Sequence, residues 1–172
     1  MRSRFRGRRV RPPMQWIPND DFGATMSLVS GIVNNSMLVD CSAGASTAAV
    51  PQIGRLTVLR IRGSINVVAP SVAGVWPVRM GICVIDSTQG VAGIDPSAEV
   101  QMDRDWLWVR TVVVQNLASG SDTYTRQPAS ELDVKVKRIM KPNTQLRLFA
   151  VQASGATATL YPDIRTLVSR VA

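Results

Sequence analysis

RLTVLRIRGSINVV, residues 55–68, is the stretch that decides the fold. From residue 58 onward its odd positions are mostly apolar and its even positions are largely polar. Successive side chains of a strand point to opposite faces, so this pattern predicts one buried and one solvated face. The apolar positions are Leu59, Ile61, Ile65 and Val67, and the polar positions are Arg60, Arg62 and Ser64.

Short apolar or alternating segments continue through the rest of the chain. Further strands are expected at 26–33, 37–41, 76–85, 106–115, 132–140, 146–153 and 164–171, with a turn at Asn34-Asn35. Segment 106–115 is apolar on both sides, which is typical of a strand covered on both faces or at a subunit contact. One short helix is expected at 95–102. About eight strands without a long amphipathic helix predict an all-β domain, either a two-sheet sandwich or a barrel.

The length of 172 residues fits one domain with a substantial core. No apolar run is long enough for a membrane-spanning helix, and no apolar segment follows the basic N-terminus as in a secretory signal. Cys41 and Cys83 are widely separated and histidine is absent, so no metal site is expected and both cysteines are interpreted as small core residues. A disulfide between them stays open at this stage.

Positive charge is concentrated at the N-terminus. The net charge is +8, from 20 basic and 12 acidic residues. Six arginines lie among the first eleven residues, and without them 14 basic and 12 acidic residues leave only +2. These arginines are Arg2, Arg4, Arg6, Arg8, Arg9 and Arg11. The chain is therefore divided into an arginine-rich arm, residues 1–15, expected to be disordered, and a nearly neutral body, residues 16–172.

Catalysis finds little support in the sequence. Without histidine a Ser-His-Asp or Cys-His arrangement is impossible, and no phosphate-binding glycine loop is present. The carboxylate pairs Asp20-Asp21 and Asp103-Asp105 are interpreted as solvated turns, with a weak alternative that they hold Ca²⁺ between subunits. We therefore expect no enzyme activity, no catalytic residue and no cofactor.

A flexible cationic arm is typical of nucleic-acid binding by charge neutralisation, because arginine binds phosphate bidentately without reading sequence. Phe5 and Trp16 are candidates for stacking on bases, although Trp16 is interpreted mainly as an anchor in the core. Arg60 and Arg62 on one strand, with Lys135 and Lys137 on another, are further candidates, against the alternative of a plain solvated face. No sequence-reading motif accompanies the arm, which favours packaging over regulation.

The order of arginine-rich arm, Pro12-Pro13 and β-only body resembles the coat proteins of small circular single-stranded DNA viruses, and secondly those of satellite-type RNA viruses. Segment 133–138, DVKVKR, with Lys141-Pro142 and the strand at 146–149, is similar to a late strand pair of the DNA-virus group. The resemblance implies a single jelly-roll β-sandwich of two antiparallel four-stranded sheets. It also implies an icosahedral shell of roughly sixty copies, or a multiple, with the arm inside. The arm is shorter than in many such proteins.

The resemblance implies that the partners are copies of the chain itself and single-stranded nucleic acid, with DNA slightly preferred over RNA, and no membrane. The location would be the virion, with the basic arm also able to serve import into a host nucleus. Trp76, Trp106 and Trp108 are candidate interface residues, against the equal alternative of core packing. Two other classes remain: a ribosomal-type nucleic-acid-binding β-barrel, and a carbohydrate-binding or glycosidase sandwich.

Overall fold

The computed structural model describes residues 14–18, 25–29, 31–41, 56–70, 72–88, 91, 94, 106–119, 122–126, 129–152 and 157–170. Ten strands run through these residues, and no helix lies among them. They are β1 (Met14–Pro18), β2 (Met26–Leu28), β3 (Asn34–Asp40), β4 (Leu56–Val68), β5 (Gly74–Asp86), β6 (Trp106–Ser119), β7 (Asp122–Arg126), β8 (Ala129–Met140), β9 (Thr144–Gln152) and β10 (Ala158–Arg170). The helix expected at 95–102 lies outside the described residues.

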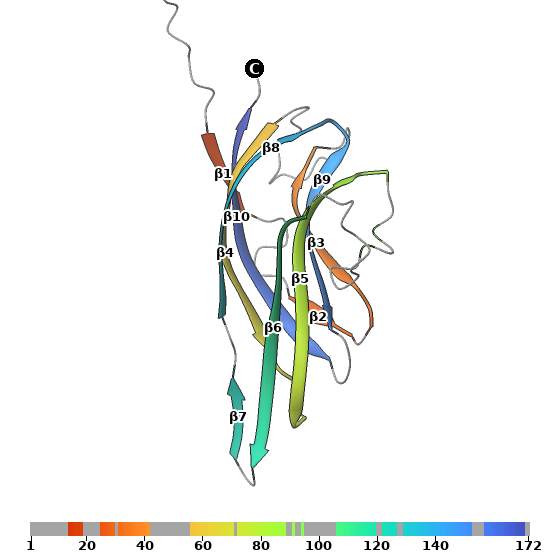
Figure 1. The fold of residues 1–172 in the computed structure, drawn as a ribbon, viewed down its shortest axis with the longest axis vertical. Helices are drawn as coiled ribbons and strands as arrows, with labels where there is room; N and C mark the ends of the chain where they lie inside the picture. Colours follow the sequence, from red (N-terminus) through yellow and green to blue (C-terminus); the bar gives the residue numbers. More distant parts are fainter. Residues whose placement is uncertain are drawn as a thin grey trace, which may run out of the picture.

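The strands form two antiparallel sheets that face each other (Figure 1). The first sheet has the order β1–β10–β4–β8, and the second has the order β3–β9–β5–β6–β7. β2 belongs to the first sheet, where it pairs with residues 158–160 of β10, while β1 pairs with residues 165–169 of the same strand. β1 and β2 therefore lie one after the other along the same side of β10, at the edge of this sheet.

The pairings are nested along the chain. β1 and β2 pair with β10, β3 with β9, β4 with β8, and β5 with β6. This is the order of one long hairpin folded over on itself, in which β10–β4 and β9–β5 contacts join the pairs side by side. The chain is thus an all-β jelly roll, as expected. Each sheet has five strands rather than the expected four. In the first sheet, β1 and β2 share the edge position beside β10, and in the second sheet β7 adds a strand at the end.

The decisive strand β4 does not keep one alternation over its whole length. Leu56 and Val58 are buried, but Ile61, Ile65 and Val67 are buried on the opposite parity. The register shifts between Val58 and Arg60 against β8, and at the corresponding point against β10, so Leu59 is the irregular residue. A bulge of this kind reverses which parity faces the core. The expectation that Leu59 belongs to the buried face was therefore wrong.

The prediction of a turn at Asn34-Asn35 was also wrong, because both residues lie within β3. The chain turns earlier, at Gly31, which adopts a φ of 70°. Only glycine enters that region without steric cost. The N–H of Ile32 donates to the carbonyl of Val29 at 3.1 Å and closes the turn. Within β3 the amide oxygen of Asn35 accepts a hydrogen bond from Arg147 on β9.

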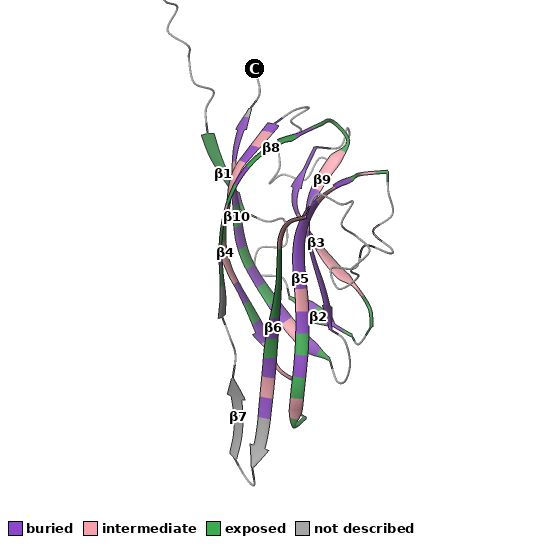
Figure 2. Cartoon of the chain, viewed as in Figure 1, coloured by how far each residue is buried: buried purple, intermediate pink, exposed green. Residues whose placement is uncertain are grey.

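The core lies between the sheets, and the burial colours alternate in the lower parts of β5 and β6 (Figure 2). A second, smaller cluster contains Cys83, Ile85, Ile94 and Phe149, with Trp106 packed against it. Both cysteines are free and buried, which confirms their interpretation as core residues. Burial, reinforced by the charge of Asp40, raises the pKa of the Cys41 thiol to about 11. Within the described residues there is no helix of the length and apolarity needed to span a membrane.

Candidate nucleic-acid interface

Four of the basic residues that were predicted to bind nucleic acid lie on the outer face of the first sheet. Arg60 and Arg62 point outward from β4, and Lys135 and Lys137 are exposed on β8. Arg60 is paired with Lys135 in the sheet register, and Arg62 is paired with Asp133. The sheet therefore brings these two sequence-distant pairs together on two neighbouring strands. The six arm arginines, and Phe5, lie outside the described residues.

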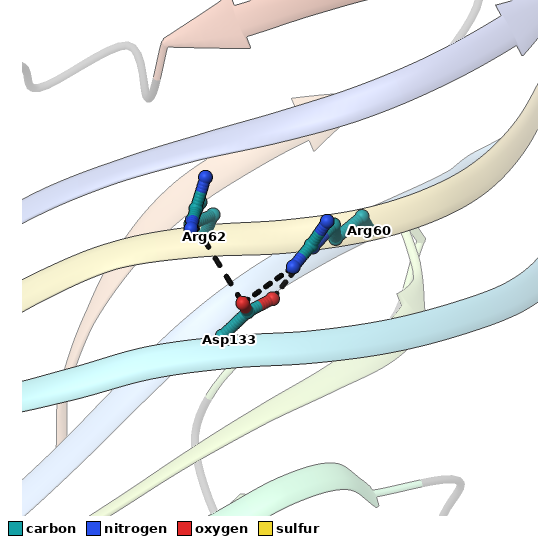
Figure 3. A network of polar contacts seen from close by, with 3 residues as sticks. All are labelled: Arg60, Arg62 and Asp133. Atoms are coloured by element: carbon teal, nitrogen blue, oxygen red, sulfur yellow. Dashed lines mark hydrogen bonds and ion pairs between the residues drawn. The ribbon is translucent and has the colours of Figure 1, made fainter.

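Asp133 ties the two β4 arginines to β8 (Figure 3). Nε and Nη2 of Arg60 donate to the two carboxylate oxygens of Asp133 at 2.6 and 2.5 Å. Nε of Arg62 lies 3.8 Å from the same carboxylate. The hydrogen bonds from Arg60, helped by the charges of Arg60, Arg62 and Lys135, hold the pKa of Asp133 below its ordinary value. This bidentate geometry fixes Arg60, whereas the Arg62 side chain is 62% exposed to solvent.

An open pocket of about 610 Å³ lies beside this cluster on the same face. It extends from β1 across β10 and β4 to β8. Two arginines, three acids and one tryptophan supply its chemistry. The lining residues are Trp16, Arg62, Gly63, Ser64, Glu131, Leu132, Asp133, Asp163 and Arg165.

Sequence reasoning missed most of this pocket. Trp16 was interpreted mainly as a core anchor, but its side chain is 43% exposed, and its neighbour Ile17, 1% exposed, is the anchor instead. Asp163 and Arg165 alternate with the buried Ile164 on β10, and this alternation was a usable sequence signal for an outward face. What joins them to Arg62 is the pairing of β10 with β4, which no local pattern indicates.

The three candidate interface tryptophans lie in the second sheet. Trp76 is 5% exposed and is buried within the subunit. Trp106 is half-buried and meets the ring of Phe149 edge-on, with centroids 6.1 Å apart. Trp108 is half-buried and packs against the main core cluster. Their contact with a neighbouring subunit stays a prediction.

The carboxylate pairs Asp20-Asp21 and Asp103-Asp105 lie outside the described residues. Among the side chains that the structure does describe, no group of three or more histidine, cysteine or acidic residues could hold a metal ion.

No protein-family model matches the chain, and no curated protein matches it. Among solved structures, it is similar to VP2 in a subviral particle of infectious bursal disease virus, with 13% identity and a TM-score of 0.35. That match covers 94% of this chain and 38% of the other. A structure of the Gt strain of the same virus matches with 16% identity and a TM-score of 0.32, covering 94% and 37%. The chain thus spans less than two fifths of the structures it matches, and its own strand order establishes the jelly roll.

Proposed function

We propose that this chain is the shell-forming subunit of a small viral capsid, which packages single-stranded nucleic acid through its arginine-rich arm. The observation that carries this proposal is the division of charge along the chain. Six arginines precede β1, while the remaining 14 basic and 12 acidic residues give the rest of the chain only +2. A nearly neutral jelly roll suits close packing against copies of itself, and a separate cationic arm suits phosphate.

The nested strand order supports the proposal, because double-sheet jelly rolls include the subunits of viral capsids. Assembly of about sixty copies, or a multiple, follows from closed icosahedral symmetry. Single-stranded DNA is the slightly preferred cargo, on the resemblance of segment 133–138 to coat proteins of that group. Trp106 and Trp108 are proposed to contact a neighbouring subunit, because both are only partly covered within one chain.

The second candidate, a ribosomal-type nucleic-acid-binding barrel, shares the arm but not the charge of the body. Such a protein covers its nucleic acid with the body as well as the tail, and a strongly basic body is then expected. Outside the arm, the 14 basic and 12 acidic residues of this chain leave only +2. This low charge favours the shell subunit.

Negative-stain electron microscopy of the purified chain, with and without single-stranded DNA, tests the proposal. The matched variant keeps the full length but replaces the six arm arginines by glutamine. The unchanged chain is expected to form uniform closed shells that retain DNA after nuclease treatment. The variant is expected to form shells that retain little or none. A chain that binds DNA as a salt-sensitive monomer and never forms shells would support the barrel alternative.

A further inference from the structure

The pocket on the outer face of the first sheet has two ends of opposite charge. One row across the strands contains Arg165, Arg62 and Asp133, which are paired in the sheet register. The next row contains Asp163, Ser64 and Glu131, which are paired in the same way. Successive residues on one face of a strand are roughly 7 Å apart, so the two rows are separate but neighbouring.

The first row is the basic end, because its single acid, Asp133, lies beside Arg62 and next to the cations of the adjacent row. Arg60 and Lys135 follow in the adjacent row and are themselves a register pair. Asp133 is engaged by Arg60 at 2.5 Å, so the negative charge of this row is largely compensated. An anionic group entering here meets Arg62, whose side chain is 62% exposed, and the exposed Lys135 beside it. Guanidinium groups bind phosphate bidentately.

The second row is the acidic end. Asp163 and Glu131 are both exposed and flank Ser64. The nearby Arg110 of β6 donates to the backbone carbonyl of Glu131 at 3.5 Å, and not to its carboxylate. Carboxylates accept hydrogen bonds and donate none when ionised, so two neighbouring carboxylates favour an amino group, which has two N–H donors, over an imino group, which has one. Trp16 lines the same pocket and exposes 43% of its surface, which offers a face for an aromatic ring.

We infer that this pocket is a single-nucleotide site for unpaired nucleic acid, selective for bases that carry an amino group. The phosphate binds Arg62 and Arg165, the base stacks on Trp16, and its amino edge donates to Asp163 and Glu131. Tryptophan stacking is a general device of single-strand binding, and acidic side chains accept from the cytosine amino group. The volume of about 610 Å³ lies within the range of small-molecule sites.

Two simpler occupants fit the pocket less well. Inorganic phosphate uses the basic row but leaves the carboxylates and Trp16 unused. An arginine from the arm of a neighbouring copy suits the carboxylates but must approach Arg62 and Arg165. A nucleotide matches both ends and the aromatic face together. This inference rests on the proposed nucleic-acid partner but concerns one pocket that the arm does not form.

Fluorescence anisotropy with labelled oligo(dC) and oligo(dT) octamers tests it, because the two differ in the amino group but not in charge. The unchanged full chain is expected to bind oligo(dC) about tenfold more tightly. Replacing Asp163→Asn together with Glu131→Gln should bring that ratio close to one. Asp86→Asn, at an exposed acid outside the pocket, should leave the ratio unchanged. Equal binding of both octamers by the unchanged chain would overturn the inference, as would a ratio that survives the double replacement.

The aromatic contact has its own test. Trp16→Ala should weaken both octamers by at least about fivefold, and Trp16→Phe should largely restore them. Tyr161→Ala is the matched control, since Tyr161 is also 43% exposed on this sheet but does not line the pocket. No loss in Trp16→Ala, or an equal loss in Tyr161→Ala, would overturn the stacking role.

Two further measurements separate the competing occupants and the two proposals. Cytidine monophosphate should displace oligo(dC) far better than inorganic phosphate; equal displacement would reduce the pocket to a phosphate site. The base preference should persist when the six arm arginines are replaced by glutamine. A preference that appears only in this variant would mean that the arm occupies the pocket of the unchanged chain, and would overturn the inference. Shells that retain DNA but show no base preference would refute the nucleotide site in the pocket and leave the proposed function intact.

Discussion

Gly63 occupies a position at which β4 and β10 approach unusually closely. A Cβ atom added there would lie 1.9 Å from the backbone oxygen of Asp163. Glycine inside a strand often marks such an approach of another backbone. The same close approach forms part of the pocket, because Gly63, Ser64 and Asp163 all line it.

Gly63→Ala is expected to destabilise the fold by about 3 kcal/mol, because the methyl group meets backbone rather than a side chain that can move. Urea unfolding followed by circular dichroism measures the change. Ser64→Ala, at the next position of the same strand, is the control and should change the free energy of unfolding by less than about 0.5 kcal/mol. A tolerated Gly63→Ala would mean that the two strands separate easily at this point.

Asp133 makes the stability of the fold depend on pH in the acid range. Its pKa is lowered in the folded chain, chiefly by the hydrogen bonds from Arg60, so folding favours its charged form. The stabilisation is present above the ordinary aspartate pKa, and is lost as the pH falls below about 4 and through the lowered value. Asp133→Asn should therefore flatten the stability curve in that window. Lys137→Gln, on the same strand, should leave the decrease in unfolding free energy at acid pH unchanged. The same decrease in Asp133→Asn would contradict this role for the ion pair.

At the scale of the element, β1 divides its two large residues between opposite environments. Ile17 is 1% exposed and points into the core, whereas Trp16 is 43% exposed and lines the pocket. Residue size and hydrophobicity alone favoured tryptophan as the anchor. The alternation of the strand decides the matter, because adjacent side chains cannot face the core together.

Ile17→Ala is expected to cost about 2–4 kcal/mol of unfolding free energy, since it removes buried methyl groups and leaves a cavity. Trp16→Ala should cost less than about 1 kcal/mol despite the larger side chain. Thermal and urea unfolding of the two variants compare them directly. A larger loss in Trp16→Ala would restore the interpretation of Trp16 as a core anchor.

How much of the fold the sequence predicts depends on whether a feature is local. Alternation at 58–68, 76–85 and 132–140 predicted strands that are present in β4, β5 and β8. The bulge at Leu59 was not predictable, because it is a property of the register between β4 and its neighbours. The pocket was missed for the same reason.

The candidate site divides in the same way. Arg60, Arg62, Lys135 and Lys137 were recognisable as outward cations from the alternation of their own strands. The carboxylate that engages Arg60 was not recognised, because Asp133 lies 73 residues further along the chain. Alternation within a strand thus indicates that a charged face exists, and strand pairing determines which of its charges remain available to a ligand.

For the whole molecule, the charge of the arm limits how much nucleic acid the proposed shell can hold. About sixty copies carry about 360 arm charges, fewer than a kilobase-scale genome requires for neutralisation. The outer face of the first sheet is a second source of cations, although Asp133 compensates part of it. The proposed shell therefore needs positive charge besides the arm, from arginine and lysine on its inner surface or from counterions and polyamines, or it contains more copies.

Replacement of Trp108 should affect assembly of the proposed shell more than folding of the single chain. Trp108 is half-buried, packs against the core of its own subunit, and lies opposite Ile82 of β5. A tryptophan with an uncovered part is typical of interface hot spots. Trp108→Ala is expected to lower the yield of shells by electron microscopy more strongly than it lowers the urea midpoint of the unassembled chain.

Val112→Ala is the matched control on the same strand, because Val112 is 7% exposed and belongs to the main core cluster. Its truncation should cost about 1–3 kcal/mol of monomer stability and should reduce assembly only through that loss. Shell yield plotted against monomer stability should then place Trp108→Ala well below the relation defined by Val112→Ala. If both variants fall on one relation, Trp108 acts through the core alone, and the subunit contact must be made by other residues.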